Sequence, residues 1–158
     1  MTYLVLKTLH IVAVTLFFGA GLASVVLKLH ADRSGDVRDI AFALRAVVFA
    51  DWVFTVPSGV LLPATGLGMV WAANYPLDTP WILGGLALYV VAGVSWIPAW
   101  LLQFKMRDTA ERCAREGAAL PPEYRRWTRV WAALGFPAFV ASVGAMWLMV
   151  GKGFAFSG

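Results

Sequence analysis

Residues 3–29 form an apolar run that is long enough to cross a lipid bilayer, and this run limits the fold more than any other feature. At about 1.5 Å per residue, a helix over the run covers the hydrocarbon core of a membrane. A secretory signal has an apolar segment of roughly half that length with a basic segment before it. No basic segment precedes this run, so we expect an uncleaved transmembrane helix.

The rest of the chain also has the composition of a membrane protein. Of its 158 residues, 60% are hydrophobic and 14% are charged, and the mean hydropathy is +0.72. Further apolar runs suited to helical spans cover residues 46–73, 81–104 and 130–150, and we expect an interfacial turn at residues 40–45. The sequence therefore predicts an all-α integral membrane protein, with residues 1–158 forming one four-transmembrane-helix bundle.

The positions of the basic residues predict how the bundle is oriented. Of the 13 Lys and Arg residues, 4 lie within residues 28–45 and 7 within residues 105–129, and the turn at residues 74–80 has none. Loops rich in Lys and Arg remain in the cytoplasm, so both termini are expected on the outer, periplasmic side. The same loops account for the pI of about 9.6, and we expect no nucleic-acid partner. The expected location is a bacterial-type inner membrane.

His10 is the main candidate for chemistry. It lies about seven residues into the first helix, roughly 10 Å below the outer surface. Ionisable groups at such depth mark a pathway, a ligand or a cofactor. The alternative is a neutral imidazole that hydrogen-bonds to another helix. Lys7, one turn nearer the outer end, would either pair with a cofactor carboxylate or extend to the membrane interface.

Other candidates share the depth of His10 or lie near the inner surface. Met69, Met146 and Met149 are near the outer ends of their helices. Histidine and thioether ligands suit both haem iron and copper, so these methionines are candidate metal ligands with His10, and ordinary packing is the alternative. Asp51, near the inner end of the second span, is either a proton relay or the partner of an arginine in an ion pair.

Several motifs resemble known membrane families. The segments DWVFTVP (residues 51–57), PWI (80–82) and SWIPAWLLQFKMR (95–107) resemble the integral membrane family filed as domain of unknown function 2269 (DUF2269), and this resemblance covers most of the chain. The segment LKTLHIVAV (6–14) is more distantly similar to the first helix of HemJ-type protoporphyrinogen oxidases and of CopD-like copper-resistance proteins.

The HemJ resemblance implies a b-type haem held by a first-helix histidine, which is His10 here. That family also depends on a lysine four residues after a tryptophan that opens the third span. The corresponding position after Trp81 is Gly85, so that lysine is absent and the resemblance favours haem or porphyrin binding over protoporphyrinogen oxidation. Gly84 and Gly85 either leave room for a flat ring or allow close helix packing.

We therefore expect an integral membrane protein that binds heme b or a related redox cofactor near its outer face, with an electron-transfer or porphyrin-related role. An enzymatic activity, if present, would be that of a membrane oxidoreductase. The alternatives are a copper-handling protein and a cofactor-free scaffold or assembly partner. The second axial ligand would be a methionine, water or His10 of the partner subunit. The expected partners are the lipid bilayer and either a second copy of the chain or a membrane redox protein.

Overall fold

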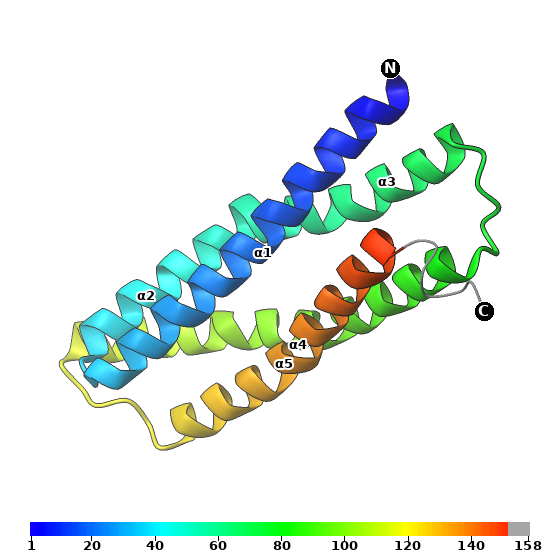
Figure 1. Cartoon of the computed structure of the whole chain (residues 1–158). Coiled ribbons are helices and arrows are strands. Elements are labelled where there is room, and N and C mark those ends of the chain that lie inside the picture. The colour runs from blue at the N-terminus through cyan, green and yellow to red at the C-terminus, as the bar shows by residue number, and fades with distance from the viewer. Residues whose placement is uncertain (152–158) are drawn as a thin grey trace. The chain divides into compact units, whose positions relative to one another are not determined.

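The computed structural model describes residues 1–151, and every regular element in that part of the chain is helical (Figure 1). In chain order the elements are α1 (Thr2–Ser34), α2 (Val37–Ala50), the π-helical turn η1 (Asp51–Thr55), α3 (Val56–Ala72), α4 (Pro80–Glu116) and α5 (Glu123–Gly151). Because α2, η1 and α3 follow one another without a break, the chain has four continuous helical segments, each long and apolar enough to cross a membrane. The prediction of an all-α protein with four spans is confirmed.

The second helical segment begins earlier than the sequence suggested. The prediction of an interfacial turn at residues 40–45 is wrong, because helix α2 already begins at Val37. Its first turn is capped by the side chain of Asp36, which accepts a hydrogen bond from the Arg38 backbone N–H at 2.7 Å. Leu44 is buried whereas the neighbouring Arg45 is exposed, so this stretch is an amphipathic helix.

A proline explains why the second segment contains a π-helical turn. Pro57 has no N–H, and its ring would clash with the carbonyl group four residues earlier in a regular α-helix. Just before it, the Val56 N–H donates to the carbonyl of Asp51, five residues back. Such π turns inside α-helices are found frequently at functional sites, and this one contains the buried Asp51.

The helices form two compact units. The first unit consists of Met1–Ala73 and Gln103–Tyr124. Within it, α1 packs along α2, η1 and α3 as a helical hairpin, and the reversal between α1 and α2 uses Gly35 at a φ of 71° (Figure 1). The last part of α4 and the first residues of α5 complete this unit.

The second unit contains residues 74–102 and the part of α5 that follows Tyr124. Here α4 and α5 run antiparallel and approach closely at small residues. A Cβ atom added to Gly84 would lie 2.9 Å from Leu148 Cδ1, and one added to Gly144 would lie 3.2 Å from Leu88 Cδ1. Small residues at these two positions therefore allow the two helices to pack closely, as is common between membrane helices.

The orientation in the membrane stays a prediction that reporter fusions can test. A reporter protein inserted at Gly117 should be active only if it is of a kind that functions in the cytoplasm. A reporter fused after Gly158, which lies outside the described residues, should be active only if it is of a kind that functions in the periplasm. Gly117 suits the insertion because it lies between α4 and α5 and nothing contacts the position where its Cβ would be. The opposite pattern at both sites would place His10 near the cytoplasmic surface.

Candidate functional site

The candidate site is built around His10, which lies on α1 and faces α3 within the first unit. Its side chain is buried, with 7% exposed. The ring nitrogen Nδ1 lies 2.8 Å from the hydroxyl oxygen of Thr65 on α3. A Cβ atom added to Gly66 would lie 3.4 Å from His10 Cε1, so a glycine allows the two helices to approach closely beside the ring. His10 therefore lies on the face of α1 that packs against α3.

The hydrogen bonds of Thr65 determine which nitrogen of His10 carries the proton. The Thr65 hydroxyl donates its one hydrogen to the carbonyl of Leu61 at 2.6 Å. Its oxygen is therefore an acceptor toward the imidazole, and the proton of neutral His10 lies on Nδ1. The other ring nitrogen, Nε2, then carries a lone pair.

The Nε2 atom of His10 is buried and has no hydrogen-bond partner within residues 1–151. Leaving a buried polar atom without a partner costs about 1–3 kcal/mol. A ligand that donates a hydrogen bond to Nε2, or a metal ion that accepts its lone pair, would offset this cost. Metal-binding histidines typically donate the N–H of the second nitrogen to a neighbouring oxygen, which is the role of Thr65 here.

Thr65 was not among the residues predicted from the sequence. It lies on the same side of the second span as Asp51, Thr55, Ser58 and Leu62, at intervals of three and four residues, and this periodicity places it on the packed face. Pairing with His10 could not be predicted, because it depends on how far the two helices are shifted along each other.

The remaining predicted ligands are divided between the two units. Lys7 is exposed on α1 and makes no hydrogen bond or ion pair with the described residues. Met69 is half-buried on α3, one turn beyond Thr65, and so belongs to the same unit as His10. Met146 and Met149 lie on α5 in the second unit. Binding of a metal or cofactor by these four residues stays a prediction.

The two glycines predicted to border a flat ring lie at the contact between α4 and α5. In addition to the closeness of Gly84 to Leu148, a Cβ atom added to Gly85 would lie 3.7 Å from the Cε atom of Met149. These neighbours support the alternative that the glycines serve helix packing. Their participation in cofactor binding stays a prediction.

Asp51 forms a second polar cluster in the first unit. Its side chain is buried within η1, and its Oδ1 accepts a hydrogen bond from the Thr55 hydroxyl at 2.8 Å. The side chain of Gln103 on α4 also hydrogen-bonds to Asp51. The Thr55 hydroxyl bonds within η1, whereas the Gln103 amide joins the second helical segment to α4, which the sequence did not indicate. A role of Asp51 as a proton relay or in an ion pair stays a prediction.

A third polar cluster lies near the end of α1. Lys28 was counted as part of a basic loop, but the structure places it within the helix, with 1% of its side chain exposed. Its Nζ atom is 2.5 Å from Asp32 Oδ2 and 5.4 Å from the centre of the Tyr124 ring. The Tyr124 hydroxyl donates to Asp32 Oδ1 at 2.8 Å. The cluster therefore connects α1 to the start of α5 within the first unit.

No group of three or more His, Cys, Asp or Glu side chains that could hold a metal ion occurs within residues 1–151. A metal bound at His10 would therefore need most of its ligands from another source. A porphyrin provides such a source with its four nitrogen atoms, and methionine thioethers provide another.

Comparison with known protein families places the chain among predicted membrane proteins. A family model described as "Predicted integral membrane protein (DUF2269)" matches residues 4–153. No curated protein and no solved structure matches the chain.

Proposed function

The chain belongs to this DUF2269 family of predicted integral membrane proteins, and from that premise we propose that it holds a b-type haem or a related redox cofactor through His10. The observation that carries the proposal is the buried, unpartnered Nε2 atom of His10. The hydrogen-bond arrangement leaves a lone pair on this atom to which no described group donates, and iron would accept that lone pair. The expected place is the inner membrane of a bacterial-type cell, with a membrane redox protein or a second copy of the chain as partner.

The site offers a single histidine nitrogen as a ligand, and this supports haem because haem iron can be held by one nitrogen of the protein. A porphyrin would bring its own four nitrogen ligands, so His10 would be the only nitrogen that this proposal requires from the protein. When bound, haem would supply one-electron transfer. Thr65 would keep the His10 ring in one orientation, and the close approach of α1 and α3 at Gly66 would keep water away from its edge.

A copper-handling function is the second candidate, and it is favoured by the position of Met69. This residue lies four positions after Thr65 and hence on the same side of α3 as the partner of His10. An imidazole and a thioether together suit Cu(I). Met146 and Met149 belong to the second unit, and their role as ligands stays a prediction.

Spectroscopy and metal analysis of the purified protein separate these candidates. After expression with a supply of haem, we expect a Soret absorption band and about one iron per haem-binding site. Copper without a Soret band would contradict haem binding and support the copper-handling function. If neither metal is retained, both candidates are contradicted and a cofactor-free scaffold or assembly partner is favoured.

A further inference from the structure

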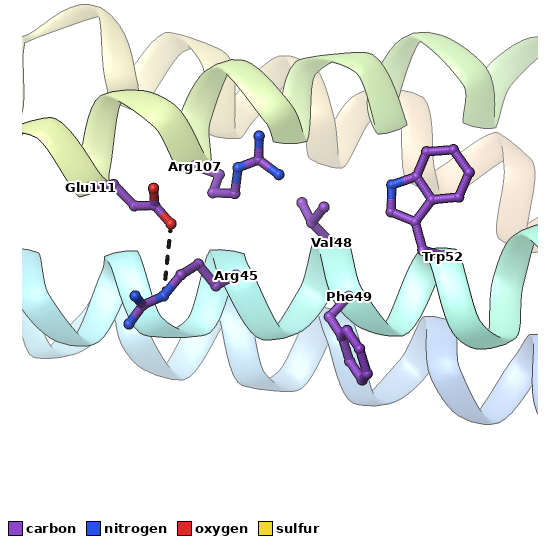
Figure 2. A pocket seen from close by; sticks show the side chains of 6 residues that line it. All are labelled: Arg45, Val48, Phe49, Trp52, Arg107 and Glu111. Carbon is purple, nitrogen blue, oxygen red and sulfur yellow. Dashed lines mark ion pairs between the residues drawn. The ribbon is translucent and has the colours of Figure 1, made fainter.

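An open groove lies on the first unit between the second helical segment and the last part of α4. It has a volume of about 430 Å³ and is lined by Arg45, Val48, Phe49, Trp52, Arg107 and Glu111 (Figure 2). The first four residues come from α2 and η1, and the last two come from α4. The groove is separate from His10 and plays no part in the function proposed above.

Two arginines make one end of this groove positive. The Arg45 side chain is 60% exposed, and its Nε atom is 3.7 Å from Glu111 Oε1, which is a loose ion pair (Figure 2). Glu111 also lies 3.9 Å from Arg115 Nη1, so one carboxylate is shared between two guanidinium groups. Within residues 1–151 the terminal nitrogens of Arg45 make no hydrogen bond, which leaves them available to an anion.

The second arginine has part of its hydrogen-bonding capacity free as well. Arg107 donates to Asp108 Oδ1 from Nε at 2.9 Å and from Nη2 at 2.7 Å. These bonds do not use Nη1, and the guanidinium is held over the Phe104 ring at 5.2 Å. Together the lining residues carry one net positive charge, contributed by Arg45 and Arg107 against Glu111. Guanidinium groups in such positions suit the oxygens of a phosphate.

The other end of the groove is apolar. Phe49 and Trp52 follow Arg45 by four and seven residues, so the three side chains lie along one side of the helix. Phe49 and Trp52 are exposed, and they belong to a segment that is apolar enough to cross a membrane. In Figure 2 the groove leads from the Arg45 and Glu111 pair toward Trp52. A charged end beside an apolar end matches the two parts of a phospholipid.

We propose that this groove binds an anionic phospholipid, with its phosphate at Arg45 and Arg107 and an acyl chain along Phe49 and Trp52. Basic pockets between membrane helices bind the headgroups of anionic lipids, and tryptophan is enriched at the membrane interface. The positive charge selects an anionic headgroup over a zwitterionic one. The apolar end distinguishes a lipid from free phosphate, which would leave Phe49 and Trp52 uncovered.

Lipid titration of the purified full-length protein in detergent micelles tests the proposal. We expect phosphatidylglycerol to bind about tenfold more tightly than phosphatidylcholine, and the Arg45→Gln/Arg107→Gln variant to lose about that factor. The matched control is Arg38→Gln/Arg112→Gln, which removes the same charge from exposed residues outside the groove. It should retain the preference. Native mass spectrometry would count the bound lipids, and circular dichroism would verify that both variants are folded.

Three results would overturn the proposal. Equal binding of the two lipids would show that the groove does not select a charged headgroup. An equal loss in both double variants would show a general effect of charge. Inorganic phosphate that displaces the lipid at the same concentration would show a phosphate site without a lipid component. As a second variant, Phe49→Ala should weaken phosphatidylglycerol binding and leave the binding of inorganic phosphate unchanged.

Discussion

Replacement of His10 by alanine should abolish the Soret band of the purified protein. The variant removes the buried Nε2 atom, which is the ligand proposed for haem iron, while alanine is small enough to fit between α1 and α3. The matched control is His30→Ala, because His30 is exposed on the same helix, roughly 30 Å along its axis. The control should keep the band, and absorption spectra at equal protein concentration would measure both.

The same measurement can separate ligation from a structural role of His10. Thr65→Val keeps the volume of the side chain but removes the oxygen that accepts from His10 Nδ1. Loss of such an outer partner typically weakens metal affinity by about 10–100-fold, so the band should persist only at higher haem concentration. A band that survives in His10→Ala, or one that disappears equally in His30→Ala, would contradict the assignment of His10 as the ligand.

The four spans could be predicted from the sequence because lipid leaves the backbone few alternatives. An apolar run such as residues 3–29 must satisfy its own backbone hydrogen bonds, and a helix does so locally. The start of the second segment was less predictable. A charged residue such as Arg45 interrupts an apolar run, yet here it lies beside the buried Leu44 on an amphipathic helix and points away from the packed face.

The partners of the polar residues were harder to predict than the helices. Periodicity placed Thr65 on the packed face, yet the pairing of His10 with Thr65 depends on the turn at Gly35 and on the lengths of both helices. A proline such as Pro57 disturbs a regular α-helix but does not by itself specify the π-helical turn that contains Asp51. Interactions between helices far apart in sequence therefore required the structure.

The interaction of Lys28 with Asp32 is another contact that required the structure. Its removal has the largest expected effect on the stability of the protein. In the sequence, Lys28 belongs to the basic connection at residues 28–45, and a lysine at the end of an apolar run normally extends toward water. In the structure the Lys28 side chain is buried and its ammonium group contacts the carboxylate one turn later on α1. Because Tyr124 bonds to the same carboxylate, Asp32 stabilises both a buried cation and the connection to the start of α5.

Asp32→Ala should therefore destabilise the protein by about 3–5 kcal/mol, the usual effect of removing one partner of a buried ion pair. The Lys28→Met/Asp32→Ala variant should recover most of this loss, because methionine fills the buried volume without a charge that needs compensation. Asp108→Ala is the matched control: its carboxylate pairs with Arg107 but is 64% exposed, so the expected loss is below about 1 kcal/mol. Denaturant unfolding in one detergent would compare the three variants. Equal losses of stability in Asp32→Ala and Asp108→Ala would contradict a buried ion pair at Lys28. A double variant as unstable as Asp32→Ala would show that the loss comes from the Tyr124 hydrogen bond rather than from the charge of Lys28.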